Sequence, residues 1–204
     1  DIPWVKYSTQ IKDQAQKLYN GIKTDLNMQN KNCRIAALNL SAGLDRREWP
    51  VEKYVDFLKQ VSAKYQGDID GWVVFTDPGK PEKTDDLIEQ INQSIVHNVR
   101  AVHEPPLQYK IIALPPQSDI RVIMEFLTHV MVLITPDTSI AHAASAMGTT
   151  VLVLTIGENV TVWDPIGVRH QIVFSEDPFS LESLPVEKVV DGFDRLMNDV
   201  LSKK

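Results

Sequence analysis

Short apolar runs alternate along the chain with longer segments in which apolar residues recur every three or four positions. The first pattern is typical of buried strands in parallel sheets, and the second of amphipathic helices. Their alternation predicts an α/β fold: a Rossmann-like, doubly wound parallel sheet with right-handed crossovers. Strands are predicted at 34–40, 71–76, 109–114, 131–134, 151–155 and 171–174, and helices at 10–22, 51–65, 83–93, 119–127, 140–147 and 186–201.

Residues 1–31 differ from the rest because they contain one predicted helix, at 10–22, and no strand. We interpret them as a helical lead-in and interdomain element, followed by a Rossmann-like domain at 32–204. A chain of 204 residues is long enough to bury a substantial core.

The stretch at 131–148, MVLITPDTSIAHAASAMG, predicts a strand, a tight turn and a helix. Pro136 ends the strand, residues 137–139 are good helix caps, and Gly148 suits the helix end. At the carboxyl end of a parallel strand, such a turn leaves unpaired N–H groups and the positive end of a helix dipole facing one crevice. We therefore expect an anion there, with His142 one turn into the helix and able to face it.

Two arginines lie in the loop after the first predicted strand, SAGLDRR at 41–47. An arginine offers planar, bidentate donors to a phosphate, and a helix start offers backbone N–H groups. Arg46 or Arg47, together with the helix start at Thr138 and Ser139, could hold a diphosphate without a metal. The alternative for the arginines is a solvated surface pair.

Charge and motif content exclude several classes of protein. The net charge of −6 argues against a nucleic-acid partner, because no basic stripe is available to neutralise phosphates. No GxGxxG motif follows the first strand, and the chain lacks a P-loop, zinc-ligand spacing and a GxSxG nucleophile elbow. His97 and His103 fall in or near a predicted loop and are interpreted as solvated. We expect no cofactor and no metal.

The single cysteine, Cys33, is interpreted as structural and is consistent with a reducing compartment. The first residues lack the pattern of a secretory signal, and no apolar run approaches the roughly 20 residues that span a bilayer. We expect a cytoplasmic protein whose membrane contact, if any, is peripheral at the inner face of the cytoplasmic membrane.

Four motifs together resemble a known enzyme family. They are REWP at 47–50, LPPQS at 114–118, PDTSIAHAASAMGTTVLVL at 136–154 and WDPIG at 163–167. Over roughly 34–200, the chain resembles the C-terminal, nucleotide-sugar-binding half of glycosyltransferase family 9, the ADP-heptose:lipopolysaccharide heptosyltransferases. The resemblance implies a GT-B architecture, in which two Rossmann-like domains face a cleft.

The resemblance also implies roles for particular residues. Ser41 and Ala42 would line the phosphates, and Arg47 stands where the family has a lysine. Ser139 replaces the glycine of the family's aspartate-threonine-glycine motif, and its Cβ restricts close backbone approach to the donor. The residues expected to bind the donor are Ser41, Ala42, Arg47, Gln117, Asp137, Thr138, Ser139 and His142, with Arg46 and Glu82 as weaker candidates.

The function implied is the donor-binding domain of an inverting, metal-independent glycosyltransferase of lipopolysaccharide or related glycan synthesis. Its partners would be a nucleotide-diphospho-sugar donor of the ADP-heptose kind, a glycan or lipid-linked glycan acceptor, and an N-terminal acceptor domain of the same protein. The catalytic base is expected in that domain, so the chain alone would be inactive. The alternatives are a non-catalytic Rossmann-like interaction module, another GT-B transferase, or a sugar-nucleotide epimerase.

Overall fold

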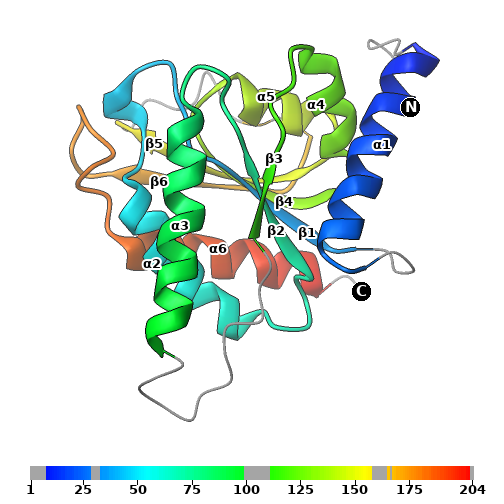
Figure 1. Cartoon of the computed structure of the whole chain (residues 1–204). Helices are drawn as coiled ribbons and strands as arrows, with labels where there is room; N and C mark the ends of the chain where they lie inside the picture. Colours follow the sequence, from blue (N-terminus) through cyan, green and yellow to red (C-terminus); the bar gives the residue numbers. More distant parts are fainter. Residues whose placement is uncertain (1–7, 29–32, 99–110, 158–164, 166, 203–204) are drawn as a thin grey trace.

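A computed structural model describes residues 8–28, 33–98, 111–157, 165 and 167–202, and everything below concerns these residues. The helices and strands alternate along the chain as the apolar pattern predicts (Figure 1). Their bounds are α1 (Thr9–Asp25), β1 (Ile35–Asn39), the 3-10 turn η1 (Asp45–Arg47), α2 (Val51–Lys64), β2 (Gly71–Phe75), α3 (Pro81–Asn98), β3 (Ile111–Leu114), α4 (Ile120–Leu127), β4 (Val130–Pro136), α5 (Ser139–Ala146), β5 (Thr150–Ile156), β6 (His170–Ser175) and α6 (Val186–Leu201).

The six strands form one sheet in the order β3-β2-β1-β4-β5-β6. Every neighbouring pair is parallel, so the doubly wound fold predicted from the sequence is confirmed. The order reverses between β1 and β4, and crevices outside the carboxyl ends of strands at such a reversal are where open α/β sheets bind ligands.

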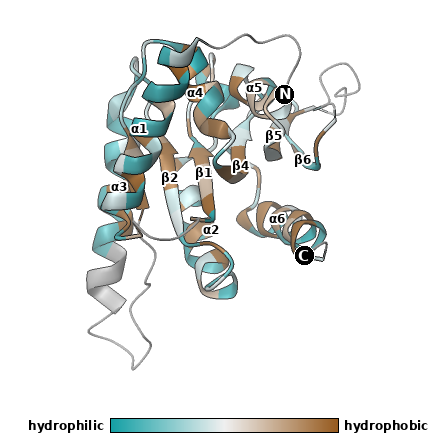
Figure 2. Ribbon diagram, turned by 90° about the vertical axis from the view of Figure 1, so that its right-hand side faces the viewer, coloured by the Kyte–Doolittle hydropathy of each residue, from teal (hydrophilic) through white to brown (hydrophobic). Residues whose placement is uncertain are grey.

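Helices cover both faces of the sheet, and two apolar cores lie between the layers. α2, α3 and α6 pack on one face around large side chains such as Trp49, Trp72 and Phe193. α4 and α5 pack on the other face, where Phe126 and Leu133 belong to the core. Hydrophobic residues are concentrated in β1, β2 and β4 at the centre, and hydrophilic residues on the outer helix surfaces (Figure 2).

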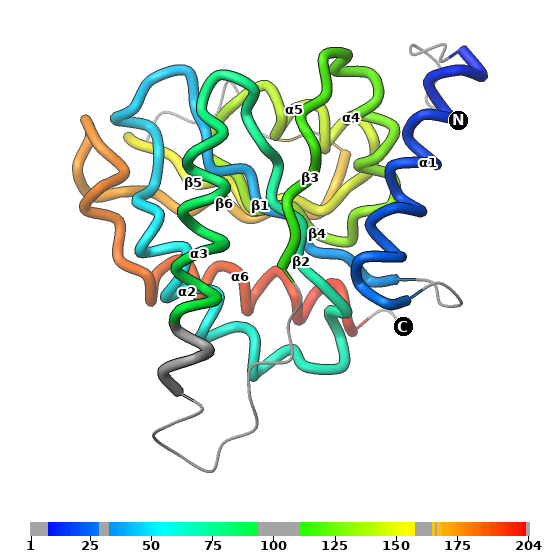
Figure 3. Tube along the Cα trace, in the orientation of Figure 1, coloured from blue at the N-terminus to red at the C-terminus, as the bar shows by residue number. Residues whose placement is uncertain are grey.

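The leading helix α1 lies alongside α4 and β3 (Figure 3). Ile22 of α1 and Leu26, the C-cap residue just after it, belong to the same core as β1. Leu26 occupies the space that a side chain at Gly71 would need. Tyr19 stacks on His129 with 4.1 Å between ring centroids and 8° between planes. That residues 1–31 act as an interdomain element stays a prediction.

The helix ends follow the local chemistry closely. α3 begins at Pro81, two residues earlier than predicted, because proline is well suited to the first helical position. Pro50 and Pro185 immediately precede α2 and α6 in extended conformations. Gly148 has a φ of +82° just after α5, as expected for a residue that ends a helix.

Some predictions fall outside the residues that the structure describes. These are His103, most of the WDPIG motif at 163–167, and the first two residues of the strand predicted at 109–114. His97 lies near the end of α3, but its side chain is not among those described. Within the described residues, Cys33 is buried, and no helix has the length and apolar character needed to cross a membrane.

Candidate functional site

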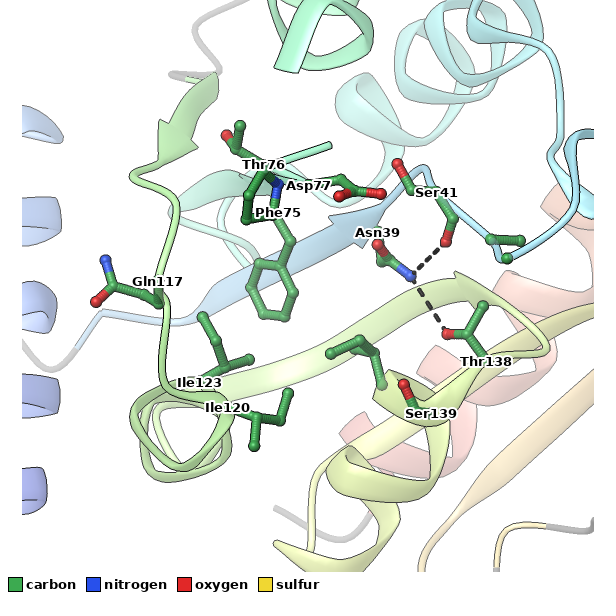
Figure 4. Close-up of a pocket in the computed structure, with 14 residues that line it drawn as sticks. Asn39, Ser41, Phe75, Thr76, Asp77, Gln117, Ile120, Ile123, Thr138 and Ser139 are labelled. Carbon is green, nitrogen blue, oxygen red and sulfur yellow. Dashed lines mark hydrogen bonds between the residues drawn. The ribbon is translucent and has the colours of Figure 1, made fainter. Parts of the chain in front are cut away.

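A cavity of about 310 Å³ opens at the carboxyl edge of the sheet, where the strand order reverses (Figure 4). Segments that follow β1, β2, β3 and β4 all contribute to it. The residues that line it are Asn39, Ser41, Ala42, Gly43, Phe75, Thr76, Asp77, Pro78, Gln117, Ile120, Ile123, Thr138, Ser139 and Ile140.

Asn39, at the end of β1, connects the two strands that flank the reversal. Its side-chain nitrogen donates to the Thr135 hydroxyl at 2.9 Å, the Ser41 carbonyl at 3.1 Å and the Thr138 hydroxyl at 3.4 Å. The Tyr54 hydroxyl, whose pKa is raised by burial, donates to the Asn39 carbonyl. Asn39 therefore fixes loops from both strands, although sequence reasoning missed it. The available signal was a polar residue inside an otherwise apolar strand.

One wall of the cavity is apolar. Phe75 comes from the end of β2, Ile120 and Ile123 from α4, and Ile140 from α5. Ile120 is half exposed, at 50%, which is unusual for a large apolar side chain on a helix with a buried face. An apolar wall beside hydrogen-bonding groups is typical of pockets for small organic ligands.

Asp77 is the only charged residue that lines the cavity in the described part of the chain. Its Oδ1 accepts the Gly79 N–H at 2.8 Å, and its side chain points toward Ser41 (Figure 4). The Thr76 hydroxyl is buried without a protein partner among the described residues. Asp77 was not among the predicted residues, although an acidic group soon after the second strand often binds ribose hydroxyls in Rossmann folds.

The start of α5 forms the side of the cavity opposite Asp77. Thr138 is the N-cap residue in an extended conformation, and its hydroxyl bonds with Asn39 and not with its own helix. No protein acceptor is found for the N–H groups of Ser139 and Ile140 within the described residues. These donors lie where the sequence predicts an anion site.

The predicted residues fall into two groups. Ser41, Ala42, Gln117, Thr138 and Ser139 line the cavity, and the structure thus brings together segments distant in sequence. That these residues bind a donor stays a prediction. The N–H of Ala42 is already engaged, because it donates to the Glu48 carboxylate at 3.0 Å.

The remaining predicted residues do not line the cavity. Arg47 belongs to η1, and its Nε is buried without a hydrogen-bond acceptor among the described residues. Arg46 is exposed, and its carbonyl accepts the Leu181 N–H. Glu82 is exposed in the first turn of α3, and His142 is exposed on α5. Asp137 is partly exposed, and its N–H donates to the Leu154 carbonyl.

Among the side chains that the structure describes, no group of three or more histidine, cysteine, aspartate or glutamate residues could hold a metal ion.

A comparison with models of protein families establishes the family of this chain. The model of glycosyltransferase family 9 (heptosyltransferase) matches residues 5–184, which is most of the chain. The chain belongs to glycosyltransferase family 9. The motifs at 47–50, 114–118 and 136–154 lie inside the matched region, so the resemblance inferred from them is confirmed. A comparison with curated protein sequences finds no significant match.

Solved structures of family 9 proteins share the fold. The E. coli ADP-heptose lipopolysaccharide heptosyltransferase II superposes with a TM-score of 0.68 at 13% identity, covering 98% of this chain and 54% of that one. A family 9 glycosyltransferase from Veillonella parvula gives 0.69 at 14% identity, with coverages of 96% and 53%. E. coli heptosyltransferase WaaC with ADP gives 0.60 at 14% identity, with coverages of 89% and 48%. The family 9 chain described here thus spans about half the length of each of these proteins.

Proposed function

We propose that this chain is the donor-binding part of an inverting, metal-independent glycosyltransferase that uses a nucleotide-diphospho-sugar of the ADP-heptose kind. The observation that carries the proposal is the cavity at the strand-order reversal, lined by Ser41, Ala42, Gln117, Thr138 and Ser139. Family membership supports it, as does the presence of ADP in a structure of similar fold.

The lining of the cavity suggests how such a donor would lie. The apolar wall of Phe75, Ile120 and Ile123 suits the flat face of a nucleobase, and the Asp77 carboxylate suits a pair of ribose hydroxyls. The diphosphate would then extend toward the unpaired N–H groups of Ser139 and Ile140. A helix start stabilises negative charge, which grows on the diphosphate as the glycosidic bond breaks.

Arg47 is the residue proposed to assist that leaving group. Its Nε is buried and lacks an acceptor among the described residues, so a ligand oxygen would satisfy a donor that is otherwise costly to bury. η1 follows the cavity-lining Gly43 closely in sequence, so Arg47 belongs to the same loop as that lining residue.

The acceptor and the catalytic base are proposed to belong to a second domain. The matching proteins are about twice as long as this chain, and GT-B enzymes react in the cleft between two domains. The acceptor would be a glycan or a lipid-linked glycan of lipopolysaccharide or a related polymer, and the reaction cytoplasmic, in keeping with the single cysteine. The chain alone would bind donor without turnover.

Titration calorimetry with ADP in the presence of EDTA tests the proposal directly. We expect saturable binding, and Arg47→Ala should weaken it by about 1.5–3 kcal/mol, the scale of a charged hydrogen bond. Arg195→Ala, on the exposed face of α6, is the matched control and should bind like the wild type. A correctly folded chain that binds no ADP would favour the non-catalytic module instead.

A further inference from the structure

Glu48 is the only charged residue among the buried side chains of the described residues. Its side chain is 7% exposed, immediately after η1. Burying a carboxylate is costly unless charges and hydrogen bonds compensate it, so its partners indicate what it does.

Glu48 has three partners, which come from two different segments. Its Oε1 accepts the Ala42 N–H at 3.0 Å and the Lys80 ammonium at 2.9 Å, and its Oε2 accepts the Lys83 ammonium. Lys80 also pairs with Asp45 at 2.6 Å. Lys80 immediately precedes α3, and Lys83 lies in its first turn.

These two segments lead into two different walls of the cavity. Ala42 lines the cavity between Ser41 and Gly43, on the β1 side. On the β2 side, residues 76–78 line it just before Lys80. Glu48 itself does not line the cavity. Any effect that it has on a ligand is therefore indirect, through the two segments that it joins.

We propose that Glu48 is a positioning residue that fixes the spacing of the β1 and β2 walls, through Ala42 on one side and Lys80 and Lys83 on the other. This inference rests on the proposed function, because the spacing matters to a ligand that contacts both walls. It assigns Lys80 and Lys83 to holding the walls together, not to contacting the ligand.

A double-mutant cycle with ADP as the ligand separates these roles. Glu48→Gln removes the charge but keeps the shape, and should raise the Kd for ADP by about tenfold. Lys83→Gln should raise it as well, and the double variant should bind no worse than Glu48→Gln alone, because both changes break one interaction. Glu52→Gln, an exposed glutamate in the first turn of α2, is the matched control.

Two results of the cycle would overturn the proposal. Wild-type affinity for ADP in Glu48→Gln would mean that Glu48 contributes to stability alone. A lower melting temperature of this variant, measured in parallel, would then show that contribution. Additive losses from Glu48→Gln and Lys83→Gln would mean that the lysine contacts the ligand independently.

Amide hydrogen exchange tests the positioning role without any ligand. In Glu48→Ala the Ala42 amide loses its acceptor and should exchange about tenfold faster, whereas amides of β5 should be unchanged. Should Glu48→Ala not fold, Lys83→Gln should show smaller increases at 41–43 and 80–83. If the wild type binds no ADP, the proposed function fails, but hydrogen exchange still tests the positioning role of Glu48. Unchanged exchange rates at 41–43 in the Glu48 variant would overturn that role.

Discussion

The side-chain nitrogen of Asn39 lies 3.4 Å from the hydroxyl oxygen of Thr138, across the point where the strand order reverses. The same nitrogen lies 2.9 Å from the Thr135 hydroxyl oxygen. One amide therefore ties the end of β1 to β4 and to the N-cap of α5. Asn39, Thr135 and Thr138 thus form a hydrogen-bonded network beside the cavity. The N-cap residue of α5 is held by Asn39, which lies outside that helix.

We expect Asn39→Ala to lower the free energy of unfolding by about 1–3 kcal/mol, because it leaves buried polar groups of Thr135 and Ser41 without their donor. Urea denaturation followed by circular dichroism measures the change. Asn92→Ala, at an exposed position of α3, is the control and should stay within about 0.5 kcal/mol of the wild type. Equal stabilities of the two variants would contradict the network.

Two glycines within helices should respond oppositely to alanine. Gly21 in α1 has open space around it, so Gly21→Ala should stabilise the protein by about 0.5–1 kcal/mol through helix propensity. At Gly192 in α6 a Cβ would lie 2.5 Å from Val173 Cγ2, in a buried contact with β6. Gly192→Ala should therefore destabilise by about 1–3 kcal/mol. Thermal unfolding of both variants checks the signs, and stabilisation at Gly192 would contradict the packing of α6 on β6.

Ser139 is exposed at the start of α5, and the family resemblance implies that it replaces a motif glycine. Ser139→Gly would remove the Cβ that limits approach of a ligand to the helix N-terminus. We expect it to tighten ADP binding by about threefold, at a stability cost of about 0.5–1 kcal/mol. Titration calorimetry measures the affinity. Weaker binding would mean instead that the serine hydroxyl is a useful donor to the ligand.

Stability should depend on pH through His129, which stacks on Tyr19. Burial lowers the pKa of His129 below its ordinary value of 6.5, while nearby Glu125 opposes the shift. Below pH 6.5 the unfolded chain therefore binds more protons than the folded one, and stability falls as the pH drops toward the folded pKa.

Urea denaturation at several pH values between about 5 and 7.5 tests this. His129→Gln should flatten the pH dependence in that window. Tyr19→Phe keeps the ring that stacks on His129, so this variant should retain the pH dependence of the wild type. An unchanged slope in His129→Gln would assign the pH dependence to other groups.

The fold was predictable because local and global preferences agree. Apolar runs gave the strands, Pro136 marked the end of β4, and Gly148 marked the end of α5. Each of these signals acts within a few residues of the element it specifies. Apart from the short 3-10 turn η1, which falls in a predicted loop, the helices and strands of the described residues match the predicted ones, with shifts only at their ends.

The candidate site was less predictable because its polar groups are organised by tertiary contacts. Asn39 acquires its role only when β4 is placed beside β1, 96 residues away from Thr135 in sequence number. Glu48 was part of a recognised motif, but its pairing with Lys80 and Lys83 joins separate loops and has no local signature. Asp77 could have been proposed from its place after the second strand.

The loop between β6 and α6 closes against the loop after β1. The Leu181 N–H donates to the Arg46 carbonyl, and the Trp49 indole donates to the Leu184 carbonyl across 135 residues. During synthesis, the loop that carries Arg46 leaves the ribosome long before residues 181–184, which bond to it. The loop that carries Arg46 and Trp49 should therefore reach its final packing only after residues 181–184 have emerged, so this part of the domain would be completed late in a nascent chain.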